Sequence, residues 1–301
     1  MTPEQIRTAR AKRPRIYARD FAEEIGITEA ALCAAFVGVG ATRISADPDR
    51  IVPGLTALGQ VMALTRNDSC VLEKAGTYDR YEAGPDIAPD IAHVTNAPID
   101  LTLFPGRWTH AFALDDPTPK GPKRSIQIFD AAGEAVHKIH LREETHAEAW
   151  APLVAALRSE DQSQTFTPGL IDSSVDGWAQ LSHLATLREG HTPARRLTKG
   201  AVERLMYRAA ETAVPVDFAV GNPGCIERHS GAIVRVLEAG PWINVLDPGL
   251  ELHLRMDHIA EIWAQPDGSV DAFGDQGQLI VRMSGAEGWA DLLAAEGDFQ
   301  P

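Results

Sequence analysis

The chain has 301 residues, 44% of them hydrophobic, which is enough material for the cores of two ordinary domains. Its formal net charge of −14 disfavours nucleic acid and anionic lipid surfaces as main partners, because both are negatively charged. Three cysteines, Cys33, Cys70 and Cys225, are too few and too widely spaced for a disulfide framework or a structural zinc site.

The first 15 residues are polar and basic, and they lack the apolar stretch of a secretory signal peptide. No apolar run along the chain reaches the length needed to span a bilayer. We therefore expect a cytoplasmic protein without membrane insertion. A pair of short helices follows, over Ile16–Glu24 and Thr28–Val37, and Thr28 is placed to cap the second helix ahead of Glu29.

Strands dominate the rest of the first half. Residues 61–76 read VMALTRNDSCVLEKAG, which is an apolar strand, a polar turn and a second strand. Alternating strands follow at 99–114, and a strand–turn–strand segment follows at 125–136. An amphipathic helix carrying Trp150 ends this half. The pattern is typical of an antiparallel sheet closed by a helix.

The second half repeats the same order of elements. Residues 216–231 repeat the first hairpin at a constant offset of 155, so that Asn67 matches Asn222 and Cys70 matches Cys225. Three further matches follow in chain order: 99–114 with 250–265, 125–136 with 269–280, and the Trp150 helix with the Trp289 helix. Matching positions in a duplicated core favour packing rather than a redox pair for the two cysteines. The sequence therefore predicts a tandem duplication.

Residues 158–174 form the clearest linker, because they are polar and contain Pro and Gly. Helices are expected after it, over Asp176–Glu189 and Thr198–Ala213. We predict an α+β fold in which each repeat has a large antiparallel sheet flanked by helices. The expected domains are 1–157 and 175–301, on either side of the linker.

Four segments resemble the bacterial cytoplasmic hemin-degrading and heme-trafficking family of HemS, HmuS and ChuX type. They are IYARDFAEEIGITEAAL (16–32), GQVMALTRNDSCVLEKAGTY (59–78), VGNPGCIERHSG (220–231) and PWINVLDPGLELHL (241–254). The resemblance covers nearly the whole chain and implies two homologous halves with heme bound in a cleft between them. It implies heme as cofactor and cargo, a role in heme trafficking and utilisation, and a heme transporter or heme oxygenase as partner.

The resemblance also implies an iron-ligating His on a helix early in the second half, with a propionate-binding Arg thirteen positions later. His183 and Arg196 keep that spacing. If His191 is instead aligned with the second His of the family motif, Arg195 takes the propionate role and Ser182 falls at the ligand position. A neutral imidazole suits heme iron and leaves the opposite face open. Both alignments remain open at the sequence level.

Three further positions bear on the heme site that the resemblance implies. Thr102 stands where the family carries a distal Arg, and Arg107, five residues on, is the nearest substitute. Gly240 and Pro241 stand where the family often has Lys-Gly, whereas His253 matches a frequent family His. These departures favour heme carriage over degradation and leave enzymatic activity open. The alternative is a degenerate member that binds another small anion or a protein partner in the cleft.

The segment HKIHLREETH (137–146) contains three His and could suggest a metal site. Its beginning reads as a strand, in which residues three apart point to opposite faces. The sequence therefore argues against a metal site in this segment.

Overall fold

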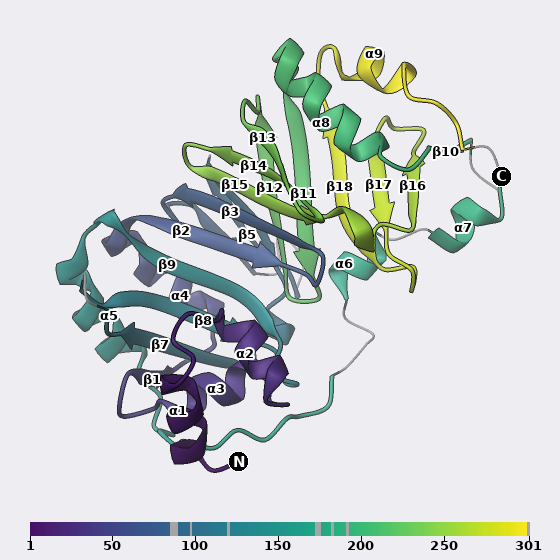
Figure 1. Ribbon diagram of the computed structural model, residues 1–301. Coiled ribbons are helices and arrows are strands. Elements are labelled where there is room, and N and C mark those ends of the chain that lie inside the picture. Colours follow the sequence, from purple (N-terminus) through teal and green to yellow (C-terminus); the bar gives the residue numbers. More distant parts are fainter. Residues whose placement is uncertain are drawn as a thin grey trace. The chain divides into compact units, whose positions relative to one another are not determined.

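The chain folds into two compact units (Figure 1). The computed structural model describes residues 1–84, 90–96, 98–118, 121–171, 176–181, 184–190 and 193–299. The second unit contains the second half of the chain together with two short segments of the first half. The first unit consists of Met1–Ala63, Gly76–Asn96 and Leu103–Val175, and the second of Leu64–Ala75, Ala97–Thr102 and Asp176–Pro301.

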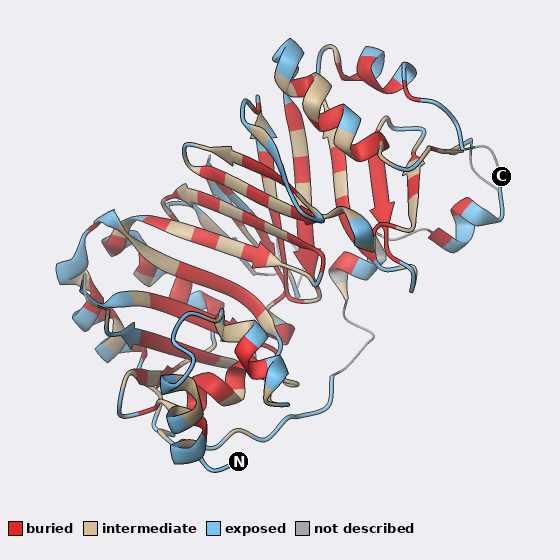
Figure 2. Ribbon diagram, in the orientation of Figure 1, coloured by how far each residue is buried: buried red, intermediate tan, exposed pale blue. Residues whose placement is uncertain are grey.

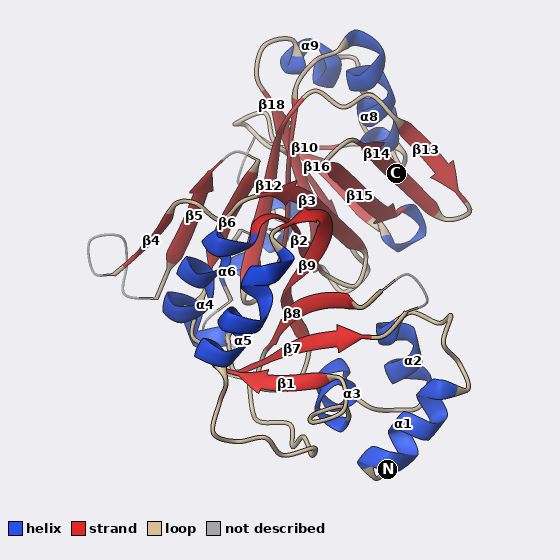
Figure 3. Cartoon of the chain, turned by 90° about the vertical axis from the view of Figure 1, so that its left-hand side faces the viewer, coloured by secondary structure: helices blue, strands red, loops and turns tan. Residues whose placement is uncertain are grey.

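The first unit is built around an antiparallel sheet with helices on both sides. Its strands are neighbours in the order β1 (Ala41–Ile44), β7 (His110–Asp116), β8 (Lys123–Phe129), β9 (Ala135–Thr145) and β2 (Gly59–Arg66). Figures 1 and 3 show α1–α3 on one side of the sheet and α4 and α5 on the other. These helices are α1 (Pro3–Ala11), α2 (Ala18–Glu24), α3 (Glu29–Ala35), α4 (Pro48–Leu55) and α5 (Trp150–Leu157). The remaining elements are the hairpin of β4 (Tyr81–Ala83) and β5 (Ala92–Asn96), and the 3-10 turns η1 (Thr56–Leu58), η2 (Pro105–Arg107) and η3 (Ala147–Ala149).

The predicted helical pair near the N-terminus is confirmed as α2 and α3. The Thr28 hydroxyl accepts a hydrogen bond from the Ala31 amide at 3.1 Å, which caps α3 as its sequence predicts. The buried side of α3, including Cys33, packs against Phe112 and Phe129 of the sheet. The apolar face of this helix therefore attaches it to β7 and β8.

The second unit contains two groups of antiparallel strands. The first group runs β3 (Cys70–Gly76), β15 (Leu250–Arg255), β14 (Trp242–Asp247) and β13 (Val236–Ala239). The second runs β10 (Arg195–Arg196), β16 (Glu261–Ala264), β17 (Val270–Phe273), β18 (Leu279–Gly285), β11 (Val216–Asn222), β12 (Cys225–Gly231) and β6 (Ile99–Leu103). The helical elements are α6 (Gly177–Gln180), α7 (Leu184–Arg188), α8 (Ala201–Thr212), α9 (Trp289–Ala294) and the 3-10 turn η4 (Met256–His258). One apolar core joins both groups of strands with α8 and α9, and Figure 2 shows the alternation of buried and intermediate positions along the strands.

The predicted α+β class, with large antiparallel sheets flanked by helices, is confirmed. One helix prediction was wrong, because Leu181 lies in a turn where a single helix over 176–189 was expected. The Leu181 carbonyl accepts a hydrogen bond from Arg282 at 3.2 Å, a tertiary contact that the helical period of the sequence does not reveal. The helix predicted over 198–213 is α8. No helix in the described part of the chain is both long and apolar enough to cross a bilayer.

The two repeats exchange strand partners within the second unit. Strand β3 of the first repeat pairs with β15 of the second, with Leu72 opposite Leu252 and Cys70 opposite Leu254. Strand β12 of the second repeat lies beside β6 of the first. Because β3 matches β12 and β6 matches β15 in the repeat alignment, the exchange is reciprocal. The sequence predicted these strands but not their partners, since the same alternating pattern serves either partner.

The turns of the two matching hairpins are held by reciprocal asparagine contacts. The Asn67 side chain accepts bonds from its own turn and donates its amide to the Gly221 carbonyl at 3.1 Å. Asn222 caps its own turn in the same way and donates to the Arg66 carbonyl at 2.9 Å. Arg66 and Gly221 are themselves matching positions of the repeat. Each asparagine therefore closes one hairpin and attaches it to the other.

A polar cluster is buried in the core of the second unit. The Lys74 ammonium lies 3.1 Å from Nδ1 of His229, and these two residues also match at the repeat offset. Glu227, two residues before His229, is fully buried. Burial raises the pKa of its carboxyl to about 8, although the nearby Thr65 and the charge of Lys74 act in the opposite direction. The carboxyl of Glu227 is thus held largely protonated at neutral pH.

Replacing Asn222 by alanine should cost about 3 kcal/mol of unfolding free energy and replacing Asn67 about 4 kcal/mol, on the order of 1 kcal/mol per lost hydrogen bond, because Asn67 also donates to the Ile280 carbonyl. Urea unfolding of Asn67→Ala and Asn222→Ala measures this loss. Asp267→Ala is the matched control, because Asp267 caps its own turn at Ser269 and, among the residues that the structure describes, makes no hydrogen bond to another hairpin. If the control loses as much stability as the two asparagine variants, the cross-hairpin contacts contribute nothing.

Glu227→Gln should stabilise the protein at pH 8 more than at pH 5. A carboxyl whose pKa is raised on folding contributes stability below its ordinary pKa of 4.5, and that contribution is lost as the pH rises to about 8. Glutamine mimics the protonated carboxyl and does not titrate. Thermal unfolding midpoints of both proteins, compared between pH 5 and pH 8, test this. If the difference in thermal midpoint between the two proteins is the same at pH 5 and pH 8, the carboxyl of Glu227 is not protonated in the folded state as proposed.

Candidate functional site

The candidate iron ligand His183 and the alternative Ser182 lie outside the described residues, as does His191. Their neighbours in the chain are described and are attached to the second unit. Before them, the Trp178 indole N–H donates to the Leu279 carbonyl at 2.8 Å. After them, Leu184 begins α7 and is buried. The described residues on both sides, Trp178 and Leu184, are therefore each fixed to the second unit.

A buried ion pair supports the first of these anchors. Asp271 is completely buried and accepts two hydrogen bonds from Arg282, at 2.7 and 2.8 Å. The hydrogen bond that Arg282 donates to Asp271 raises the pKa of Arg282, so this guanidinium stays charged. Because the side chain of Arg282 is fixed in this way, the second N–H of its Nη2 is directed at the Leu181 carbonyl. The pair therefore sets where α6 ends.

Glu261 of β16 supports the second anchor. Its Oε1 accepts bonds from Arg188 of α7 at 2.5 and 3.1 Å, and its Oε2 accepts one from the Trp263 indole at 2.9 Å. Arg196 of β10 adds a longer ion pair, with Nε 3.8 Å from the same Oε2. Burial acts to raise the pKa of Glu261, but these bonds and charges outweigh it and lower the pKa. The carboxylate is therefore ionised and shared between two arginines.

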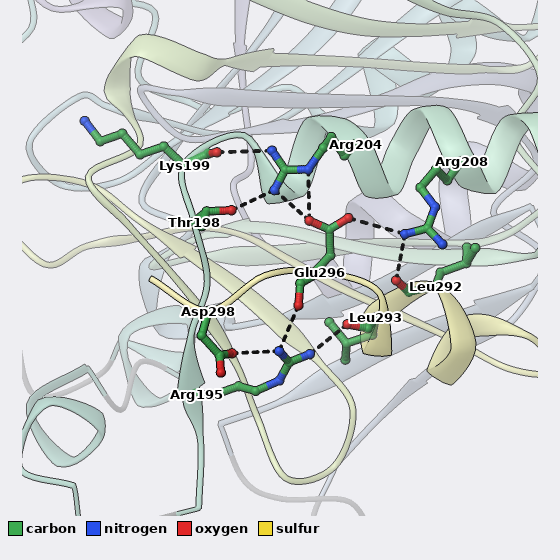
Figure 4. Close-up of polar contacts among 9 residues, drawn as sticks. All are labelled: Arg195, Thr198, Lys199, Arg204, Arg208, Leu292, Leu293, Glu296 and Asp298. Atoms are coloured by element: carbon green, nitrogen blue, oxygen red, sulfur yellow. Dashed lines mark hydrogen bonds and ion pairs between the residues drawn. The ribbon is translucent and has the colours of Figure 1, made fainter. Parts of the chain in front are cut away.

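The two candidate propionate ligands, Arg195 and Arg196, are adjacent in β10 and therefore point to opposite faces of the strand. Arg195 is occupied by the C-terminal segment, as Figure 4 shows. It donates to the carbonyls of Leu293 and Glu296 at 2.7 and 3.0 Å and to the Asp298 carboxylate at 2.7 Å. These three charge-assisted bonds attach the C-terminal segment to β10 through Arg195.

Figure 4 also shows that Arg204 and Arg208 of α8 already pair with the Glu296 carboxylate. The Glu296 carboxylate is buried and accepts bonds from Arg204 at 2.6 and 3.0 Å. Arg208 forms a further ion pair with it at 3.5 Å. Arg204 additionally donates to the Thr198 hydroxyl at 2.8 Å. The arginines of α8 therefore hold the C-terminal segment around Glu296.

Arg196 is held far less tightly than its neighbour. Besides the 3.8 Å ion pair with Glu261, its guanidinium lies over the Phe299 ring, 4.2 Å from the centroid. Within the described ranges its guanidinium makes no hydrogen bond, and about a third of its side chain is exposed. Of the two adjacent arginines, Arg196 therefore has more hydrogen-bonding capacity left for an anionic ligand.

The guanidinium of Arg228 lies beside Thr102, a contact that the sequence did not predict. Arg228 of β12 donates to the Thr102 hydroxyl at 2.7 Å and forms an ion pair with Asp100 at 3.7 Å. Its side chain is 38% exposed. Arg228 is 126 positions away in the chain, and only the pairing of β12 with β6 brings the two together. A donor is thus present where the resemblance expected one, although Thr102 itself carries no charge.

The remaining sequence candidates occupy more constrained places. Arg107 lies in η2 of the first unit and is buried. His253 of β15 shares a hydrogen bond of 2.7 Å with Asn244, and burial lowers its pKa against the effect of Glu251. Gly240, before Pro241, turns the β13–β14 hairpin with a φ of 61°.

The three-histidine segment is not assembled as a metal centre among the residues that the structure describes. Nε2 of His137 is 2.6 Å from the Tyr78 hydroxyl, and its ring stacks on Trp108. Burial lowers the pKa of His137 to about 3, so its imidazole is neutral. Cys33, Cys70 and Cys225 are buried thiols whose pKa values are raised by burial. These groups pack the core.

Comparison with known proteins identifies relatives along the whole chain. A family model described as the haemin-degrading HemS/ChuX domain matches two segments, 26–157 and 180–294, in line with the duplication. The hemin transport protein HemS of Yersinia enterocolitica is 31% identical, over 97% of this chain and 96% of that protein. The hemin transport protein HmuS of Yersinia pestis is also 31% identical, over 90% and 85%.

Solved structures agree with these sequence relatives. Holo-PhuS, a heme-binding protein from Pseudomonas aeruginosa, is 32% identical and has a TM-score of 0.88, covering 99% of this chain and 100% of that one. The heme degrading enzyme ChuS of Escherichia coli O157:H7 is 25% identical with a TM-score of 0.80, over 98% and 99%. The likeness therefore extends through both units.

Proposed function

Because the chain belongs to the HemS/ChuX haemin-degrading family, we propose that it binds heme and carries it for heme trafficking and utilisation. The observation that supports this most strongly is the full-length likeness to proteins named for hemin transport and heme binding. A heme transporter or a heme oxygenase in the cytoplasm would be the partner that delivers or receives the heme. The alternative of a degenerate member with another ligand rests on the departures at Thr102 and Gly240–Pro241, and the full-length likeness to heme-binding proteins disfavours it.

We assign iron ligation to His183. This proposal is supported by the spacing of thirteen between His183 and Arg196 and by the full-length likeness to heme-binding proteins. Ser182, the alternative in the other alignment, offers a hydroxyl, which is a poor ligand for heme iron compared with imidazole. A single axial imidazole would leave the other face of the heme open for exchange.

The groups present fit the rest of a heme molecule. Its propionates are carboxylates, and Arg196 is a partly exposed guanidinium with hydrogen-bonding capacity left. Arg195 would have to give up three bonds, each worth about 1.5–3 kcal/mol for a charged group. We therefore choose Arg196. Arg107 and His253 remain predictions, since both are largely buried or already bonded.

Heme degradation is the second candidate function, because a heme degrading enzyme is among the similar solved structures. Bound heme supplies the reactive iron for oxygen chemistry, and the protein would contribute binding, orientation and nearby donors. Arg228, hydrogen-bonded to Thr102, is a donor of the required kind. Carriage needs only binding and release, so we propose carriage as the primary function.

Hemin titrated into the purified protein should give a saturable Soret change at one heme per chain. His183→Ala should weaken binding by at least about 10-fold and shift the Soret maximum, because the axial nitrogen is lost. Ser182→Ala is the matched control for the other alignment and should behave as wild type. Failure of the wild type to saturate would overturn heme binding. A normal spectrum for His183→Ala would overturn only the ligand assignment.

Arg196→Gln should weaken hemin binding by about 10-fold or more, the value of one charge-assisted contact. Arg195→Gln should instead lower the thermal midpoint, because it releases the C-terminal segment, and it should affect hemin affinity less. Both variants are compared by Soret titration and by thermal unfolding. The opposite ranking in hemin affinity would return the propionate role to Arg195.

A further inference from the structure

The aromatic ring of Phe299 lies against the guanidinium of Arg196, with Cζ of the arginine 4.2 Å from the ring centroid. The negative face of an aromatic ring attracts a cation at this distance. Phe299 is 38% exposed, so burial of apolar surface alone does not account for the place of its ring. The half-exposed ring therefore has a specific partner, and that partner is the arginine proposed to bind a propionate.

The C-terminal segment that carries Phe299 is fixed to β10 beside Arg196. The Phe299 amide donates to the Arg196 carbonyl at 2.8 Å, and Asp298 forms an antiparallel bridge with Leu197. Arg195 adds its three hydrogen bonds to the same segment, as Figure 4 shows. These bonds hold the segment independently of the ring contact. The ring is thus presented to the guanidinium by a segment that is already in place.

The ring and the Glu261 carboxylate restrain Arg196 without using its hydrogen-bond donors. Oε2 of Glu261 lies 3.8 Å from Nε, which is too far for a hydrogen bond, and the ring contact is made at Cζ. The N–H donors of a guanidinium lie in one plane, and a pair of them matches the two oxygens of a carboxylate. Arg196 is therefore confined while its donors stay available to a carboxylate.

Confinement of this kind strengthens the binding of a ligand. A long side chain that is free in solution loses rotamer freedom when it binds, and this loss weakens the affinity. The side chain of Arg196 is about a third exposed and lacks a hydrogen bond within the described ranges, so the ring supplies much of its restraint. Removing the ring should therefore weaken the binding of a carboxylate ligand by about 5-fold.

Resting on the proposed heme function, we propose that Phe299 is a positioning residue that preorganises Arg196 to bind a heme propionate. The two adjacent arginines then have complementary roles. Arg195 attaches the C-terminal segment to β10, and the segment places the ring that confines Arg196. Phe299 acts through the guanidinium, so its effect depends on the charge of the propionates.

The test titrates hemin and hemin dimethyl ester into the wild type, Phe299→Leu and Phe299→Tyr. Both propionates of the ester are uncharged. Leucine keeps an apolar side chain but has no aromatic face, and we expect it to weaken hemin binding by about 5-fold. It should bind the ester as the wild type does. Tyrosine keeps the ring and is the matched control, which should match the wild type with both probes. Because the ring is half exposed, the thermal midpoints of all three proteins should be similar.

A double variant separates positioning from general packing. Phe299→Leu combined with Arg196→Gln should bind hemin no more weakly than Arg196→Gln alone, since the ring acts only through the guanidinium. An additive loss in the double variant, or an equal loss of affinity for the ester, would mean that the ring acts by packing, and the positioning role is then overturned. Wild-type hemin affinity in Phe299→Leu also overturns it and leaves the heme function standing. If the wild type does not bind hemin, the proposed function itself fails.

Discussion

Two side-chain amides, those of Asn67 and Asn222, connect the two repeats at their hairpin turns, and the second unit depends on this contact. Each amide caps its own turn and donates to a carbonyl of the other hairpin, at Gly221 and at Arg66. A turn that is satisfied only by itself can lie anywhere on a surface. When the asparagine of one turn also donates to a carbonyl of the other hairpin, the two hairpins are held in one register. Any other register would leave that buried carbonyl without a donor, which costs free energy.

Fixing the turns allows the strands behind them to be exchanged. Strand β3, which follows the Asn67 turn, pairs with β15, and β12, which follows the Asn222 turn, lies beside β6. The exchange brings together residues that are far apart in the chain, including Lys74 with His229 in the core and Arg228 with Thr102 at a half-exposed position. Duplication alone would give two similar sheets. Exchange places residues of one repeat among those of the other.

The distribution of arginines follows from the acidic character of the chain. With a net charge of −14, most guanidinium groups find carboxylates or carbonyls nearby. Arg195 and Arg204 are committed to the C-terminal segment around Glu296, which stabilises the edge of the sheet but removes them as ligand groups. Arg196 differs because Glu261 satisfies Arg188 first. Selectivity for an anionic ligand can therefore arise from which arginine is left with only a long ion pair.

The sequence by itself determined the duplication, the helical pair with its Thr28 cap, and the antiparallel strands, because period, turn residues and caps are local properties. It also placed His183, Arg195 and Arg196 as candidates, through the spacing of a family motif. Only the tertiary structure decided that β3 pairs with β15 and that Arg195 is occupied, since these outcomes depend on contacts between residues about a hundred or more positions apart. A one-dimensional pattern shows which side chains can bind, and the folded chain decides which of them are already bound.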